Sequence, residues 1–292
     1  MFLVAVVPAA VYGILSFTVP ESPRYLISKG RTDEARAIFA RLVPAVDLDK
    51  TMNELTLAIE TDKKNAGVSI RGKALGLQPI VWIGIILSVF QQFVGINVIF
   101  YYSNVLWQAV GFDESSSFTI TVITSVTNIA TTLIAIALID KVGRKPLLLV
   151  GSTGMAVTLG TMAVIFGTAP LVDGQPQLGD VAGPVALIAA NLFVVSFGMS
   201  WGPVVWVLLG EMFPNRIRAA ALGLAAAGQW TANWLITVTF PGLRDVLGFA
   251  YGFYALCAVL SLLFVWRWVE ETKGKTLEEM HNEAHVARPS PQ

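Results

Sequence analysis

Seven stretches of the chain are long, apolar and free of ionisable residues in their interiors. They run over residues 1–19, 79–102, 118–139, 146–169, 183–210, 218–240 and 246–266. Crossing a hydrocarbon core of ~30 Å takes about 20 helical residues, whereas the strands of a membrane barrel are about 9–11 residues long and alternate in polarity. The pattern therefore predicts an all-α, polytopic membrane helical bundle with seven transmembrane helices.

The composition fits a membrane protein and argues against other classes. Apolar side chains make up 54% of the chain and charged ones 14%, whereas ordinary globular chains carry roughly 25% charged residues. A net charge of zero provides no field that would attract nucleic acid. The single cysteine, Cys257, excludes an intramolecular disulfide and a cysteine metal site. No nucleophile–base pair, phosphate loop or dinucleotide fingerprint occurs, so we expect no enzyme activity, catalytic residue, cofactor or metal.

The positive charges predict the orientation of the chain. Nineteen of the twenty Lys and Arg residues lie in every second connection, namely 20–78, 140–145, 211–218 and the tail from 267. The other connections hold only Arg244. Because loops rich in Lys and Arg stay in the cytoplasm, we expect a multi-pass protein of the plasma membrane, surrounded by membrane lipid. Its N-terminus is expected outside and its C-terminus in the cytoplasm.

The same pattern divides the chain into four segments. Residues 1–19 are predicted to form an isolated transmembrane helix, and residues 20–78 a cytoplasmic segment with amphipathic helices. Residues 79–268 would form a six-helix transmembrane bundle, and residues 269–292 a cytoplasmic tail. Within the second segment, Thr32 is expected to cap one helix, because Asp33 and Glu34 follow in its first turn.

Six short motifs follow one another along the chain. They are Pro20-Glu21-Ser22-Pro23-Arg24, Gln91-Gln92-Phe93-Val94-Gly95-Ile96-Asn97, Asp140-Lys141-Val142-Gly143-Arg144-Lys145, Gly202-Pro203 with Trp206, Gln229-Trp230, and Glu271-Thr272-Lys273-Gly274. Together they resemble the sugar porter family of the major facilitator superfamily, over residues 1–280. That family has twelve spans, and its Pro-Glu-Ser-Pro-Arg motif follows the sixth; here it follows the first. The resemblance implies an N-terminally truncated transporter, with the last helix of the N-terminal half and the C-terminal six-helix half.

Amide and indole side chains inside the apolar stretches suit a neutral, hydroxylated ligand. An amide both donates and accepts hydrogen bonds, as a sugar hydroxyl does, and an indole offers a flat apolar face to a sugar ring. By the resemblance, the sugar-contacting residues are Gln91, Gln92, Asn97, Asn128, Trp206, Gln229 and Trp230. On a straight helix Gln92 and Asn97 point roughly 140° apart at 100° per residue. We therefore predict a bend or unwinding at Gly95, as in the interrupted helices of many transporters.

The resemblance also implies gates for alternating access. Tyr101 and Tyr102 match outer-gate tyrosines, and Gly202 matches a further gate position. A cytoplasmic charge network would hold the inner gate shut through ion pairs among Glu21, Arg24, Asp140, Arg144, Glu211, Arg218 and Glu271. The implied function is transport of a monosaccharide, which this chain alone is not expected to complete.

Several alternatives stay open at this level. Amides inside a membrane can simply bond neighbouring helices, and cytoplasmic cations can serve topology alone. The chain could be a sugar-binding sensor or a non-functional remnant of a longer transporter, and the solute could be a polyol or another neutral polar molecule. No acidic residue lies inside the apolar stretches. By the resemblance, a coupling proton would act through the N-terminal half.

Overall fold

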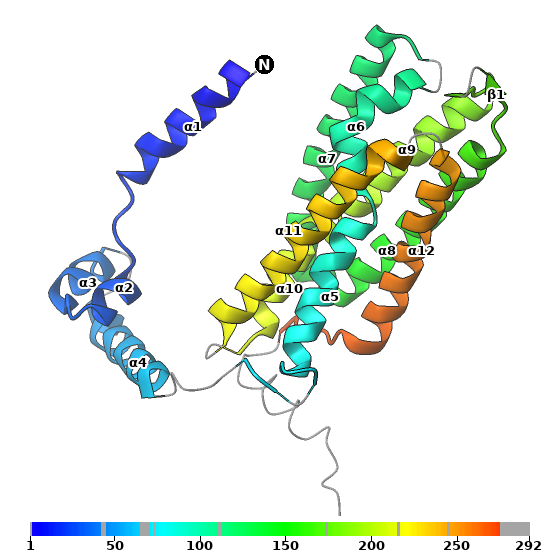
Figure 1. Cartoon of the computed structure of the whole chain (residues 1–292). Coiled ribbons are helices and arrows are strands. Elements are labelled where there is room, and N and C mark those ends of the chain that lie inside the picture. Colours follow the sequence, from blue (N-terminus) through cyan, green and yellow to red (C-terminus); the bar gives the residue numbers. More distant parts are fainter. Residues whose placement is uncertain are drawn as a thin grey trace, which may run out of the picture. The chain divides into compact units, whose positions relative to one another are not determined.

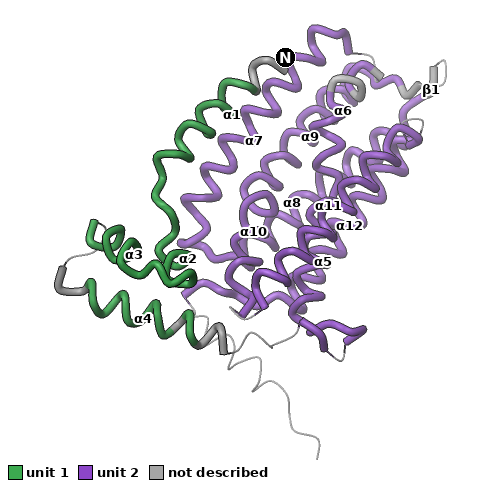
Figure 2. Tube along the Cα trace, turned by 60° about the vertical axis from the view of Figure 1, so that its left-hand side comes forward, with its two compact units in different colours: residues 1–68 green, residues 69–292 purple. Residues whose placement is uncertain are grey.

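The computed structural model describes residues 2–41, 45–64, 70–72, 74–109, 112–172, 175–214, 217–243 and 246–274. The predicted tail extends beyond residue 274, outside the described residues. The described chain is almost entirely helical, apart from the two-residue antiparallel strands β1 (Leu171–Val172) and β2 (Gln175–Pro176). Contacts divide the chain into two compact units, residues 1–68 and 69–292, which Figure 2 shows in different colours.

Unit 1 holds four helices. They are α1 (Phe2–Ser16), α2 (Pro23–Ser28), α3 (Thr32–Phe39) and α4 (Ala45–Lys64). A small apolar core from α2, α3 and α4 joins the last three, and its buried members are Leu26, Ile27, Ala35, Met52 and Ile59. Helices α3 and α4 confirm the prediction that helices occur in the segment after the first apolar stretch.

The prediction that Thr32 caps α3 was wrong. The N-cap residue is Arg31, and Thr32 is the first helical residue. The Arg31 guanidinium donates to the Glu34 carboxylate at 2.6 Å from both Nε and Nη2. The pair holds Arg31 over the first turn, where Asp33 and Glu34 already stabilise the positive end of the helix. A side-chain cap from Thr32 is therefore not used.

Unit 2 is a bundle of long helices (Figure 1). It contains α5 (Pro79–Phe93), α6 (Ile96–Ala109), α7 (Glu114–Val142), α8 (Arg144–Thr168), α9 (Ala182–Gly198), α10 (Trp201–Met212), α11 (Arg218–Leu243) and α12 (Leu247–Trp268). Helix α12 packs along α8, α11 packs along α5, and α9 lies against both α8 and α7. One continuous apolar core runs through these helices, while apolar side chains also cover much of the outside of α7, α11 and α12.

Two of the long helices are interrupted. Helix α5 ends at Phe93 and α6 begins at Ile96, and between them Gly95 has φ +81°, a conformation that favours glycine. This break confirms the predicted interruption at Gly95. A second break separates α9 from α10 at Met199 and Ser200, and the sequence analysis did not predict it.

Five helical stretches among the described residues are long and apolar enough to cross a membrane. They are Pro79–Ser103, Glu114–Val142, Arg144–Thr168, Ala182–Met212 and Leu247–Trp268. They coincide with five of the seven predicted spans. Helix α1 is shorter, and α11 carries Gln229 and Asn233, whose amides lower its hydropathy. The helical membrane fold is therefore supported, whereas the count of seven spans is not confirmed.

Candidate functional site

Amide side chains from three helices of unit 2 meet at the α5–α6 break. Asn97 Nδ2 on α6 donates to Gln92 Oε1 on α5 at 2.6 Å and to Asn233 Oδ1 on α11 at 3.0 Å. Both amide hydrogens of Asn97 are therefore in use. On α11, Thr237 Oγ1 also donates to Asn233 Oδ1, at 3.2 Å. The break at Gly95 thus lets Gln92 and Asn97 reach one another, and we call Gln92, Asn97 and Asn233 the amide chain.

Asn233 is absent from the set of predicted sugar-contacting residues. Its position four residues after Gln229 places both on one face of α11, and that spacing is the sequence signal that points to it. Because Asn233 accepts from Asn97 across the two helices, it belongs to the same polar cluster. The bond also agrees with the alternative in which an intramembrane amide simply joins neighbouring helices.

Gln91 lies beside the amide chain and faces α10. Its Nε2 donates to the backbone oxygens of Trp201 at 2.8 Å and Gly202 at 3.2 Å. The side chain is nearly enclosed, with 3% of the residue exposed. Its Oε1 atom is buried and has no hydrogen-bond partner in the part of the chain that the structure describes. An unpaired buried acceptor costs about 1–3 kcal/mol, so this oxygen is a candidate ligand contact.

Gln229 offers a second acceptor of the same kind. The residue is 6% exposed, and its Oε1 is likewise buried without a partner among the described residues. It lies on α11, one turn before Asn233. The preceding residue, Gly228, lies against α5, since a Cβ there would stand 3.2 Å from Ile85 Cγ2. Two unpaired carboxamide oxygens therefore come from the helices that carry the amide chain.

The other predicted sugar contacts lie further out. Trp206 follows Gly202 by one turn of α10 and is 42% exposed, and Trp230 on α11 is 62% exposed. Asn128 on α7 lies against α9, where a Cβ on Gly198 would stand 3.1 Å from its Oδ1. No side-chain hydrogen bond among the described residues joins these three to the amide chain.

The two predicted gate tyrosines have different surroundings. Tyr102 donates from its hydroxyl to Thr237 O at 3.0 Å, and its ring centroid lies 4.9 Å from that of Phe240. Tyr101 is 58% exposed. Helix α11 therefore holds Tyr102 in place, while the ring of Tyr101 projects outward.

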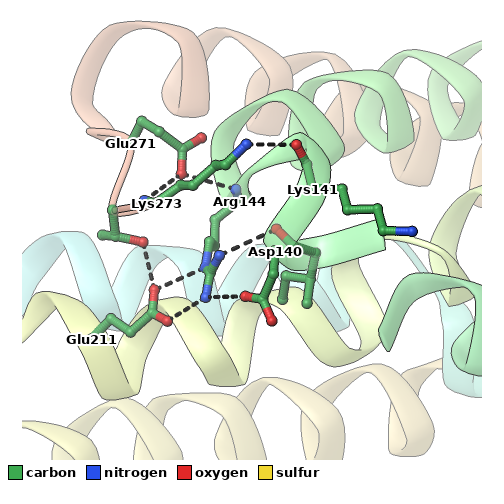
Figure 3. A network of polar contacts seen from close by, with 8 residues as sticks. Asp140, Lys141, Arg144, Glu211, Glu271 and Lys273 are labelled. Atoms are coloured by element: carbon green, nitrogen blue, oxygen red, sulfur yellow. Dashed lines mark hydrogen bonds and ion pairs between the residues drawn. The ribbon is translucent and has the colours of Figure 1, made fainter. Parts of the chain in front are cut away.

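A second polar cluster lies at the turn between α7 and α8 (Figure 3). The Arg144 guanidinium donates to both oxygens of Glu211, from Nε at 2.9 Å and from Nη2 at 2.6 Å. Its Nη2 also lies 2.9 Å from Asp140 Oδ1. Thr272 Oγ1 donates to Glu211 Oε2 at 2.6 Å. The Arg144 side chain is only 9% exposed, so its bidentate pair with Glu211 is partly shielded from water. Bidentate, charge-assisted hydrogen bonds of this kind are strong.

Glu271, which follows α12 in sequence, caps the start of α8. Its carboxylate accepts from the backbone N–H groups of Arg144 at 3.0 Å and Lys145 at 2.9 Å, which lack partners inside the helix. Gly143 makes room for it, because a Cβ there would stand 2.7 Å from Glu271 Oε2. Burial opposes ionisation of Glu271, but the backbone donors of Lys273, Arg144 and Lys145 outweigh it and lower the pKa of the carboxyl.

Not all of the predicted network residues meet here. Arg218 donates from Nε to Phe213 O at 3.1 Å, and its Nη2 is buried without a partner among the described residues. Glu21 and Arg24 belong to unit 1, where Glu21 Oε1 accepts from Ser22 N at 3.3 Å. The described cluster in unit 2 therefore joins Asp140, Arg144, Glu211 and Glu271, together with Thr272 and Lys273.

The chain is similar in sequence to known transporters. A family model described as "Sugar (and other) transporter" matches residues 1–284. The chain is 55% identical over 282 residues to a glucose transport protein of Synechocystis, covering 96% of this chain and 60% of the relative. It is 39% identical over 288 residues to the D-xylose-proton symporter of Escherichia coli K12, covering 96% of this chain and 56% of the relative.

A solved structure agrees with these sequence relatives. The proton:xylose symporter XylE bound to 6-bromo-6-deoxy-D-glucose superposes with a TM-score of 0.78 at 39% identity, covering 95% of this chain and 57% of that one. The chain therefore spans somewhat more than half the length of the curated relatives that it matches.

Within the described residues, no three His, Cys, Asp or Glu side chains are placed to hold a metal ion.

Proposed function

Because the chain belongs to the sugar (and other) transporter family, we propose that it forms the sugar-recognising part of a transporter that works by alternating access. The observation that carries the proposal is the pair of buried carboxamide oxygens on Gln91 and Gln229, neither of which has a hydrogen-bond partner in the described part of the chain. Each can accept a hydroxyl hydrogen, and the ligand would then remove the cost of leaving that oxygen unpaired. The proposed substrate is a monosaccharide such as glucose or xylose, which are named for the relatives.

The surroundings of the two oxygens suit a neutral sugar. The amide chain of Gln92, Asn97 and Asn233 carries no formal charge. Gln92 follows Gln91 directly in α5, and Asn233 lies one turn after Gln229 in α11. Trp206 on α10 and Trp230 on α11 offer flat apolar faces, which suit the C–H surface of a pyranose. Asn128 completes the proposed contact set from α7. A handful of net hydrogen bonds of ~0.5–1.5 kcal/mol each is enough for a millimolar site, which needs about 4 kcal/mol.

The gates and the orientation belong to the same proposal. Tyr101 and Tyr102 would close the site on the outside, together with movement at Gly202. The cluster around Arg144 and Glu211 would hold the cytoplasmic ends of α7, α8 and α10 together when the inner gate is shut. The Lys- and Arg-rich connections support an orientation with the C-terminus in the cytoplasm and the N-terminus outside, in the plasma membrane.

We assign no proton-binding role to this chain. In the described spans the acidic residues, Glu114, Asp140 and Glu211, all lie at helix ends. A proton carrier in a symport cycle needs a titratable group inside the membrane. Coupling, where it occurs, would therefore use a carboxyl outside these spans.

Sugar binding by the chain in lipid nanodiscs tests the proposal. Titration calorimetry with D-glucose and D-xylose should give saturable, millimolar binding, and Gln229→Leu should weaken it about tenfold, as expected for losing one hydrogen bond to a buried group. Gly223→Ala on the same helix is the matched control, because a Cβ there meets open space. Equal binding of L-glucose, or no saturable binding of either sugar, would contradict the proposal. Preference for the open-chain polyol glucitol would indicate a different solute.

A further inference from the structure

The first turn of α10 holds the Gln91 amide in one orientation. We propose that Gln91 therefore acts only as a hydrogen-bond acceptor toward the sugar, and that Trp201 and Ser152 are positioning residues that keep it so. The inference rests on the proposed function, because it specifies the polarity of one contact in that site. It adds two residues, Trp201 and Ser152, that the sequence motifs do not single out.

The orientation of the Gln91 amide follows from elementary hydrogen bonding. Its inner end faces two backbone oxygens, those of Trp201 at 2.8 Å and Gly202 at 3.2 Å. A carbonyl oxygen only accepts, so the amide end that faces them must be the NH₂ group. Turning the amide over would place its own oxygen against two others and lose both bonds. With both hydrogens occupied, only Oε1 remains for a ligand.

Trp201 is itself anchored by a chain of buried hydrogen bonds. Its indole Nε1 lies 2.9 Å from Ser152 Oγ and 3.2 Å from Leu148 O. Ser152 Oγ lies 3.1 Å from Ser261 Oγ, and Ser261 Oγ lies 2.7 Å from Ala258 O. The side chains of Trp201, Ser152 and Ser261 are fully buried. These hydrogen bonds therefore join α10 to α8 and α12 in the interior of the bundle.

The donor and acceptor roles in this series of hydrogen bonds follow from its last acceptor, Ala258 O. Ala258 O can only accept, so the single hydroxyl hydrogen of Ser261 is committed to it. Ser152 must then donate to Ser261, and a lone pair of Ser152 is left to receive the Trp201 indole N–H. The hydrogen bonds therefore run in the order Trp201, Ser152, Ser261, Ala258, and the Trp201 indole N–H is shared with Leu148 O. A network that is fully satisfied in this way is rigid.

Such an anchor is needed at this point of the backbone. Helix α9 ends at Gly198, and Ser200, just before Trp201, has φ −138° and ψ −89°, outside helical values. Helix continuity therefore does not set the position of Trp201. The indole and the two serines do so instead, and the position of the Trp201 carbonyl in turn sets the Gln91 amide.

The consequence for specificity is chemical. The sugar must offer a hydroxyl hydrogen to Gln91 Oε1, since no donor of Gln91 is free. Replacing that hydroxyl by fluorine keeps a weak acceptor but removes the hydrogen, and replacing it by hydrogen removes both. When the hydroxyl that donates to Gln91 Oε1 is the one replaced, the fluoro and the deoxy sugar should therefore bind equally weakly. A hydroxyl that accepts from the protein would instead tolerate fluorine better than hydrogen.

Analogue binding to the full chain in nanodiscs tests the acceptor role. D-Glucose is compared with its monodeoxy and monodeoxyfluoro derivatives at each carbon, by calorimetry. At one carbon, both derivatives should bind about tenfold more weakly than glucose, as expected for an unpaired buried acceptor. In Gln91→Leu, glucose should lose about the same factor, and the derivatives at that carbon should then bind as well as glucose.

The positioning role has its own readouts. Ser152→Ala should leave the chain folded, because the Trp201 indole keeps Leu148 O as an acceptor. It should weaken glucose binding about threefold and shrink the discrimination at the same carbon only. The indole N–H resonance of Trp201, assigned by its absence in Trp201→Phe, should shift in a ¹⁵N–¹H spectrum. Thr153→Val is the control, because its neighbouring hydroxyl is exposed and bonds only its own helix, at Leu149 O.

The outcomes separate the two ideas. If the unchanged chain binds no sugar, the proposed function fails and the acceptor assignment falls with it. If glucose binds but every fluoro derivative binds better than its deoxy partner, or Gln91→Leu keeps full discrimination, the acceptor assignment alone is overturned. If Ser152→Ala behaves like Thr153→Val in both binding and the indole resonance, the positioning role is overturned.

Discussion

The ring of Tyr254 on α12 lies against the backbone of Gly95, so closely that a Cβ atom on Gly95 would stand 2.7 Å from Tyr254 Cδ2. Gly95 also has φ +81°, where a residue with a side chain is strained. Two independent features of the fold therefore require glycine at the α5–α6 break. The break, in turn, is what brings Gln92 to Asn97.

Gly95→Ala is expected to destabilise unit 2 by about 1–3 kcal/mol, the range for a strained backbone residue, with a further loss from the contact with Tyr254. Thermal unfolding followed by tryptophan fluorescence reports on this unit, because all eight tryptophans lie after residue 69. In the double variant Gly95→Ala with Tyr254→Leu, the clash with the Tyr254 ring should be relieved. The double variant should therefore recover only part of the lost stability, because the backbone strain at residue 95 remains.

Gly223→Ala on α11 is the matched control for that change. A Cβ there meets no atom within 4 Å, and alanine favours a helix over glycine by about 1 kcal/mol. Its unfolding temperature should stay the same or rise. A loss as large as that of Gly95→Ala would show that any glycine substitution harms the bundle.

Arg144→Gln should destabilise the cytoplasmic end of the bundle by about 1.5–3 kcal/mol, as expected for losing hydrogen bonds between charged groups. It removes both bonds to Glu211 and the pair with Asp140. The measurement is the same fluorescence-detected unfolding at pH 7. Arg267→Gln removes an exposed cation from the last turn of α12 and should change stability by less than about 0.5 kcal/mol. Equal effects of the two changes would mean that the ion pairs of Arg144 contribute nothing to stability.

The capping of α8 by Glu271 predicts a dependence on acid. The pKa of this carboxyl is lowered in the folded chain from an ordinary value of 4.5. Its contribution to stability is therefore complete above that ordinary value, and it is lost as the pH falls through the lower, folded value. Glu271→Gln should be less stable than the unchanged chain at pH 7, and the difference should shrink steadily below about pH 4.5.

Glu270→Gln serves as the comparison, because Glu270 is exposed beside it. This change should leave the acid profile of the unchanged chain intact. A difference between the Glu271→Gln and unchanged chains that stays constant from pH 7 to pH 3 would mean that the carboxylate charge does not stabilise α8.

The orientation can be read by chemical labelling, because Cys257 is the single cysteine and is buried. In a Cys257→Ser background, Gly179→Cys places a thiol in the connection expected outside, and Lys141→Cys places one in the turn expected inside. Both positions are exposed. A membrane-impermeant maleimide should label Gly179→Cys on intact cells and Lys141→Cys only after permeabilisation. The reverse pattern would invert the proposed topology.

Some features of this protein are determined by local sequence. Apolar runs without interior charge specify helices that can lie in a membrane, because backbone polar groups must be satisfied within each segment there. A glycine between Gln92 and Asn97 made the interruption of that helix predictable, since the two amides cannot otherwise share a face. The motif around Arg144 and its resemblance likewise pointed to a charge network with Glu211 and Glu271. The structure adds that the Arg144 guanidinium pairs with Glu211, whereas Glu271 accepts from the Arg144 backbone N–H.

Other features depend on contacts between helices distant in sequence. The anchoring of the Trp201 indole by Ser152 and the capping of α8 by Glu271 join residues about 50 to 130 positions apart, and no local pattern encodes such pairings. Asn97 and Gln91 illustrate the division. The sequence shows that both are amides in apolar stretches. Packing decides that Asn97 donates to other side-chain amides, whereas Gln91 donates to backbone oxygens. As a result the Gln91 side-chain oxygen is buried without a partner among the described residues.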